Sequence, residues 1–168
     1  MRITAGGTGD VDTVLALLDG ATAWLVGLGR TGQWGTEPHS TNPRRVAQVT
    51  EWAEGGRLHL AHLDGQVAGA LAVGEAMPWV PPATEPELYV NLLVTNRALA
   101  GRGVGARLLG HARDMARERG AHLLRVDCYG GGDRALVRYY ERQGFTATEP
   151  FAVGEWPGQL LVQRLRSG

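Results

Sequence analysis

A glycine-rich segment, AGRGVGA at residues 100–106, most constrains what this chain can fold into. An apolar run from Leu88 to Val94 precedes it and a helix-forming run from Arg107 to Arg119 follows, which predicts a strand, a loop and a helix. Glycines let a ligand approach the backbone, and the free N–H groups and dipole of a helix start favour an anion there. The segment therefore predicts a loop that binds phosphate or pyrophosphate.

Length and composition predict one globular domain over residues 1–168. The hydrophobic fraction is 43% and the formal net charge at pH 7 is zero, with no conspicuous basic run. We therefore expect neither a nucleic-acid partner nor a membrane partner. The single cysteine, Cys128, allows no disulfide within the chain, and neither a signal segment nor a membrane span is evident. These features favour a cytoplasmic location.

Hydrophobic periodicity and turn residues predict a mixed α/β domain. The clearest local pattern is Asp64-Gly65 between two apolar runs, which is typical of a β-hairpin. The four prolines within residues 78–86 predict a non-helical loop. The predicted strands cover residues 2–5, 57–63, 66–73, 88–94, 123–128, 145–149 and 159–165. The first predicted helix follows the N-cap Asp10 and ends near Gly27 or Gly29, and the second runs from Pro43 to Glu54. The third begins at Val104 and ends before Gly120, and the fourth runs from Asp133 to Gln143.

One interpretation of the glycine segment is a dinucleotide site. Gly101, Gly103 and Ala106 fit the pattern G-x-G-x-x-[G/A], and Asp127 lies at a distance suited to a ribose-binding acid. However, six residues (95–100) separate the strand from the first glycine, and only 62 residues follow Ala106. Both observations disfavour a doubly wound nucleotide domain.

A second interpretation accounts for more of the chain. The strand, the glycine segment and the following helix resemble motif A of the GNAT superfamily of acyl-CoA-dependent N-acyltransferases. A second block, from Asp133 through Tyr139 to Phe145, resembles N-x-x-A-x-x-x-Y-E-x-x-G-F. The resemblance implies a mostly antiparallel central sheet flanked by helices, in the order β-α-α-β-β-β-α-β-α-β-β. It also implies an N-acetyltransferase that transfers an acetyl group from acetyl-CoA directly to a primary amine.

A non-catalytic domain that binds or senses acyl-CoA is the alternative. Two departures from the family pattern favour it: Ala100 stands where Arg or Gln is frequent, and Asp133 replaces Asn. Leu136, in place of Ala, is a third departure. An ionised Asp133 can accept but not donate a hydrogen bond.

The resemblance also assigns residues to the cofactor acetyl-CoA. Main-chain groups of the apolar strand would pair with the pantetheine arm, the glycine loop would hold the pyrophosphate, and the start of the last helix would contact the arm. The residues concerned are Leu92, Leu93, Val94, Arg102, Gly103, Val104, Gly105, Ala106, Arg107, Asp133 and Leu136.

For catalysis, the resemblance places Tyr140 at the general-acid position, where a phenol with a pKa of roughly 10 stays protonated at neutral pH. Glu87 is the candidate base, Glu75 and Glu85 are weaker ones, and a chain of waters could serve instead. The five histidines lack metal-ligand spacing, so we expect no metal.

The acceptor is a small-molecule or peptide amine that the sequence does not identify. Tryptophans in or near loops, together with glutamates there, favour a small cationic amine; they are Trp24, Trp34, Trp79 and Trp156, with Glu37, Glu75 and Glu85. Dimers are common in the family, so a homodimer is a further expectation.

Overall fold

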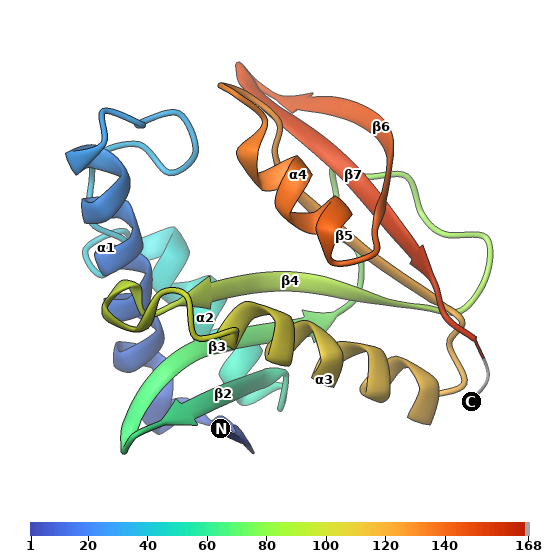
Figure 1. The fold of residues 1–168 in the computed structure, drawn as a ribbon, viewed down its shortest axis with the longest axis horizontal. Helices are drawn as coiled ribbons and strands as arrows, with labels where there is room; N and C mark the ends of the chain where they lie inside the picture. Colours follow the sequence, from blue (N-terminus) through green and yellow to red (C-terminus); the bar gives the residue numbers. More distant parts are fainter. Residues whose placement is uncertain (167–168) are drawn as a thin grey trace. The chain divides into compact units, whose positions relative to one another are not determined.

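The computed structural model describes residues 1–166, and it confirms the mixed α/β fold and the predicted order of elements (Figure 1). The strands are β1 (Arg2–Ala5), β2 (Leu58–Leu63), β3 (Gln66–Gly74), β4 (Glu87–Thr95), β5 (Leu123–Tyr129), β6 (Thr146–Val153) and β7 (Trp156–Arg164). The helices are α1 (Val11–Gly27), α2 (Pro43–Glu54), α3 (Val104–Glu118) and α4 (Ala135–Arg142), with short 3-10 helices η1 (Thr8–Asp10) and η2 (Arg97–Leu99).

Hydrogen bonding orders the seven strands β1-β2-β3-β4-β5-β7-β6. The pairs β1–β2, β2–β3, β5–β7 and β6–β7 are antiparallel, whereas β4 and β5 are parallel. The mostly antiparallel sheet is therefore confirmed.

The chain forms two compact units, each built from separated stretches of sequence. The first comprises Met1–Ala72 and Leu92–Leu108, and the second comprises Val73–Asn91 and Leu109–Gly168. In the first unit α1 packs beside α2, and in the second α4 packs on β5 and β6 (Figure 1). The expectation of one domain over residues 1–168 stays a prediction.

The β2–β3 hairpin confirms the prediction from Asp64-Gly65. The backbone φ angles are 52° at Asp64 and 75° at Gly65, so both turn residues are left-handed. A two-residue turn with two positive φ angles matches the twist of antiparallel strands, and Asp-Gly adopts it readily.

Helix α2 begins at Pro43 as predicted, and Asn42, the residue before it, caps the helix. The Asn42 side chain accepts hydrogen bonds from the N–H groups of Arg44 at 3.0 Å and Arg45 at 3.4 Å. Proline needs no hydrogen bond at the first helical position, and the asparagine satisfies two exposed donors.

The predicted start of helix α4 and the predicted bounds of the last two strands were wrong. Helix α4 begins at Ala135 rather than Asp133, because Arg134 is left-handed with φ 59° and the Asp133 side chain accepts a bond from the Ala135 N–H. Helix α1 begins at Val11, directly after the predicted N-cap Asp10, although the Asp10 carboxylate accepts the Gly7 N–H at 2.8 Å and makes no capping bond to α1. Strands β6 and β7 extend much closer to their Gly154 turn than predicted, because prolines and polar residues obscured the strand pattern.

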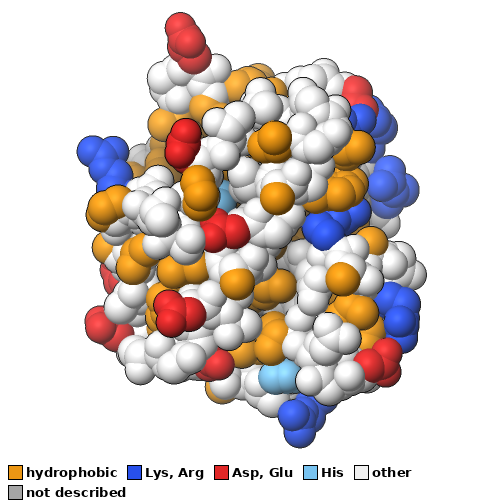
Figure 2. All heavy atoms as spheres, turned by 90° about the vertical axis from the view of Figure 1, so that its left-hand side faces the viewer, with side chains coloured by type: hydrophobic (Ala, Val, Ile, Leu, Met, Phe, Trp, Pro, Cys, Tyr) orange, Lys and Arg blue, Asp and Glu red, His pale blue; other side chains and the backbone are white. Residues whose placement is uncertain are grey.

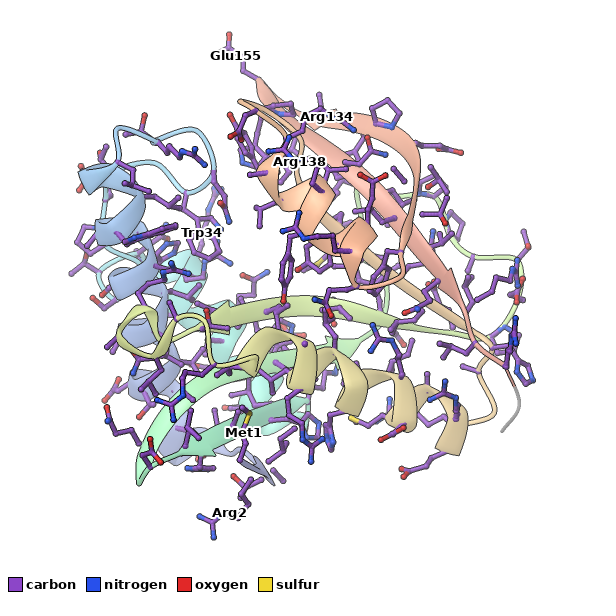
Figure 3. All side chains as sticks on the ribbon, viewed as in Figure 1. Met1, Arg2, Trp34, Arg134, Arg138 and Glu155 are labelled. Carbon is purple, nitrogen blue, oxygen red and sulfur yellow. The ribbon has the colours of Figure 1, made fainter. Side chains whose placement is uncertain are left out.

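In the first unit, the connection between α1 and α2 is tied back to α1 through His39. The buried imidazole Nε2 lies 2.8 Å from Thr22 Oγ1, and the His39 N–H donates to the Asp19 carboxylate. The ring of Trp34, which lies on the same connection (Figure 3), meets the imidazole edge-on with centroids 5.5 Å apart. Burial lowers the pKa of His39, and the nearby Arg45 lowers it further.

We predict that stability falls in acid partly through His39. Because the folded chain resists protonating this ring, its contribution is complete above the ordinary histidine pKa of about 6.5 and declines as the pH falls below that value. The free energy of urea unfolding at about pH 7.5 and about pH 5.5 should therefore differ less in His39→Gln than in the wild type. Exposed His122→Gln is the control, and an identical pH dependence in His39→Gln would contradict the assignment.

Candidate functional site

The glycine loop before α3 has the conformation that an anion-binding loop requires. Gly101 and Gly103 are left-handed, with φ 79° and 73°, and a Cβ atom at either position would meet open space. Val104 opens α3, whose first intrahelical bond runs from the Arg107 N–H to the Gly103 carbonyl at 3.0 Å. The N–H groups of the first helical turn precede that bond and have no helical acceptor, so they can bind a ligand.

The start of α3 is fixed by close packing on β3. A Cβ atom added to Gly69 would lie 2.9 Å from Val104 Cγ1, 2.9 Å from the Val94 carbonyl oxygen and 3.1 Å from Leu108 Cδ1. Glycine at this strand position therefore lets the helix start approach the sheet.

Asn96 anchors the residues that separate β4 from the glycine loop. Its N–H donates to the Ala68 carbonyl at 2.7 Å, and its side chain donates to the Val67 carbonyl at 3.3 Å. The same side chain accepts from the Ala98 N–H at 3.0 Å and so begins η2. The sequence interpretation missed both Gly69 and Asn96, although an Asn before a short polar segment is a recognisable cap.

The other residues predicted around the loop belong to the first unit. Leu92 and Val94 are buried, Leu93 is half-buried, and Ala106 and Arg107 are exposed. Arg102 pairs with Asp64 at 3.1 Å on the surface. An exposed pair of this kind contributes little to stability, so a phosphate could compete for the guanidinium.

The start of α4 carries the predicted residues Asp133 and Leu136. Asp133 is exposed and bonds the Ala135 N–H at 3.1 Å, while Leu136 is half-buried. Arg138 bonds the Asp133 carbonyl and lies 3.8 Å from its carboxylate; Figure 3 shows Arg134 and Arg138 near this end of the helix. Asp133 thus holds the helix start in place.

Tyr140 is buried on the inner face of α4. Its ring meets those of Tyr139 and Phe145 edge-on, with centroids 5.3 Å and 5.7 Å apart. Burial raises the pKa of the Tyr140 phenol well above its ordinary value, and Cys128 nearby adds to this effect. The hydroxyl therefore keeps its proton at any physiological pH and is available as a donor.

Glu87 forms a buried ion pair with Arg125 across β4 and β5. Both carboxylate oxygens accept from the guanidinium, one at 2.8 Å, and the two side chains are only 13% and 6% exposed. Arg125 also donates to the Pro81 carbonyl at 2.9 Å. With both oxygens engaged, this geometry favours a structural role for Glu87 over proton transfer, and its role as base stays a prediction.

Comparison with known proteins identifies the family. The profile of the acetyltransferase (GNAT) family matches residues 26–145, which is more than half of the sequence. The chain belongs to the GNAT family. The N-acetyltransferase YesJ of Bacillus subtilis, whose function is uncharacterized, is 26% identical over 147 residues, covering 81% of this chain and 76% of YesJ. An acetyltransferase of Agrobacterium fabrum is 35% identical over 83 residues, covering 49% of this chain and 53% of that protein.

Solved structures show the same GNAT fold. An acetyltransferase of this family from Listeria monocytogenes superposes with a TM-score of 0.74 at 21% identity, covering 98% of this chain and 94% of the other. A ribosomal-protein-alanine N-acetyltransferase from Brucella melitensis gives 0.70 at 19% identity, covering 98% and 100%. A structure from Salmonella typhimurium, determined with its cofactor acetyl-CoA, gives 0.66 at 18% identity, covering 99% and 94%.

The tryptophans predicted near the acceptor of this GNAT chain have varied surroundings. Trp24 is 42% exposed and carries the Arg97 guanidinium 3.6 Å above its ring centre. Trp156 packs against Tyr129 and Phe151, which favours a packing role. Trp79 is 40% exposed and hydrogen-bonds to Asp127, a contact that the sequence did not predict.

Neither surface charge nor metal-ligating side chains indicate a further functional site among residues 1–166. On the face in Figure 2, charged side chains of both signs are scattered among uncharged and hydrophobic ones. Residues 1–166 contain no cluster of three or more His, Cys, Asp or Glu side chains suited to a metal. Within the same residues, no helix is long and apolar enough to cross a membrane.

We predict that Glu87→Gln will destabilise the fold, because it leaves the Arg125 charge buried without its counter-ion. The expected loss in the free energy of urea unfolding is on the order of 3 kcal/mol. The matched control is Glu85→Gln, which removes the half-buried partner of the exposed Arg164 and should leave the unfolding midpoint near that of the wild type. A Glu87→Gln protein of wild-type stability and greatly reduced turnover would instead support Glu87 as the base.

Proposed function

We propose that this GNAT protein is an N-acetyltransferase that transfers an acetyl group from acetyl-CoA directly to a primary amine. The observation that carries the proposal is the loop before α3, where left-handed Gly101 and Gly103 leave open space beside unbonded helix-start amides. That donor set suits a pyrophosphate. GNAT acetyltransferases use acetyl-CoA, and membership of the family supports the same donor here.

In this proposal, main-chain N–H groups from Arg102 to Ala106 bind the pyrophosphate of acetyl-CoA. Arg102 and Arg107 add charge-assisted bonds, for which Arg102 exchanges its surface contact with Asp64. Main-chain groups of Leu92, Leu93 and Val94 pair with the pantetheine arm. Asp133 and Leu136, at the start of α4, complete the set of cofactor contacts.

Tyr140 is proposed to protonate the departing thiolate after the amine attacks. A general acid must hold its proton at working pH, and burial raises the pKa of this phenol further. The amine nitrogen forms a bond to the thioester carbon, the carbon–sulfur bond breaks, and the thiolate takes the phenolic proton. The nitrogen loses its surplus proton to a chain of waters, and water returns a proton to the phenolate. A cytoplasmic location and a small-molecule or peptide acceptor remain part of the proposal.

Replacement of Gly103 by Val should weaken acetyl-CoA binding by about 10-fold or more, because a branched side chain would fill the open space beside the helix-start amides. Gly35→Val is the matched control, since Gly35 is also left-handed at φ 70° and a Cβ atom there would meet open space, but it belongs to the connection between α1 and α2. Titration followed by the shift in Tm measures both affinities. Equal weakening by the two substitutions would contradict the proposed pyrophosphate position.

Tyr140→Phe should lower kcat by about 100-fold or more while changing acetyl-CoA affinity less than about twofold. Tyr139→Phe, one residue earlier and half-buried, should retain activity. The assay is thiol release from acetyl-CoA over a panel of polyamines, aminoglycosides, amino acids and peptide N-termini. Because the chain contains no lysine, acetylation of its own lysine side chains cannot contribute.

The results of these assays distinguish an acetyltransferase from a non-catalytic domain that binds or senses acyl-CoA. Full activity in Tyr140→Phe would remove this residue from the mechanism. Tight acetyl-CoA binding with no turnover on any amine would favour a binding or sensing domain.

A further inference from the structure

In the second unit, several polar side chains lie where the pairing between β4 and β5 ends. The parallel register runs from Glu87 opposite Leu123 to Val90 opposite Val126. Asn91 and Asp127 are the next residues on their strands. Because alternate strand residues share a face, Asn91 lies on the face of Glu87 and Tyr89, and Asp127 on that of Arg125.

Contacts between the strands confirm that these faces coincide. Glu87 pairs with Arg125, and the Tyr89 hydroxyl donates to the Asp127 carboxylate. The Tyr89 side chain is fully buried, and both burial and the Asp127 charge raise its pKa, so it remains a donor. Neighbouring side chains therefore hold the position of the Asp127 carboxylate.

Asp127 is half-buried and lacks a cationic partner among residues 1–166. The guanidinium on the same face belongs to Arg125, which already donates to both oxygens of Glu87 and to the Pro81 carbonyl. Tyr89 and Trp79 supply only neutral donors, and burial raises the pKa of Asp127 despite their hydrogen bonds. A carboxylate in this environment gains from a ligand that brings a positive charge.

Asn91 supplies a second hydrogen-bond acceptor at the same end of the paired strands. Its Nδ2 donates to the Glu75 carbonyl at 2.9 Å, which fixes the orientation of the amide. Its Oδ1 is shielded from solvent and accepts no hydrogen bond within the described part of the chain. A buried acceptor without a donor is costly, and a ligand with several N–H groups would satisfy it.

We infer that Asp127 and Asn91 bind the ammonium group of the acceptor, so that this protein acts on amines that are cationic at neutral pH. The carboxylate supplies the charge, the amide oxygen supplies a second acceptor, and the indole of Trp79 provides an aromatic surface, which cations favour. This inference rests on the proposed function, because it assigns the substrate class of the same acetyl transfer.

The test compares acceptors and variants. Primary alkylamines and polyamines, which are cationic at neutral pH, should be acetylated, whereas aromatic amines that are neutral there should not. Asp127→Asn keeps an oxygen for the Tyr89 hydroxyl but loses the charge, so KM for the cationic amine should rise about 10- to 100-fold. KM for acetyl-CoA should stay within about twofold of the wild-type value.

The matched control is Glu149→Gln, which removes an exposed carboxylate close enough to Arg125 to act on its pKa. It should leave both KM values unchanged. An unchanged amine KM in a folded Asp127→Asn protein, or equal turnover of neutral aromatic amines by the wild type, would overturn the inference and leave the proposed acetyl transfer intact. Absence of acetyl-CoA binding and of turnover on every amine would overturn both.

Discussion

The Glu87–Arg125 ion pair is the contact on which the polar face of the second unit depends. It links β4 to β5, and through the Pro81 carbonyl it also holds the proline-rich loop before β4. Two opposite charges that are almost fully buried are tolerated only when their hydrogen bonds are complete. Because Arg125 is fully used in this way, the next carboxylate along β5, that of Asp127, has no cationic partner among residues 1–166. The distribution of charge at the proposed acceptor site follows from this pairing.

Most of the fold could be predicted from the sequence because its strongest patterns are local. Pro43 restricts the backbone at a helix start, whereas Asp64-Gly65 and the glycines before α3 permit left-handed conformations that other residues rarely adopt. Helix α4 was placed two residues early because nothing in a single sequence indicates that Arg134 adopts a left-handed conformation. Such a conformation is uncommon for a residue with a side chain.

The candidate site was predictable only in part. The glycine loop could be predicted, since its function resides in the backbone conformation that glycine permits. Partners distant in sequence could not: no sequence pattern places Arg125, which lies on another strand, against both carboxylate oxygens of the candidate base Glu87. No sequence pattern links Asp127 to Asn91, and the parallel register of β4 and β5 places them at the same end of the two strands. Which charge remains uncompensated is a property of the folded sheet.

The interleaving of the two units has a consequence for synthesis of the chain. The first unit needs Leu92–Leu108 in addition to Met1–Ala72, and Val73–Asn91 of the second unit is made in between. During translation, the first unit therefore cannot fold completely until Leu92–Leu108, which includes the glycine loop, has been synthesised. Strand β4 is divided between the units at Asn91 and Leu92, so neither unit can be produced as one continuous fragment. Native contacts that span long stretches of sequence slow folding, and an emerging chain of this kind has a prolonged period with exposed apolar strands.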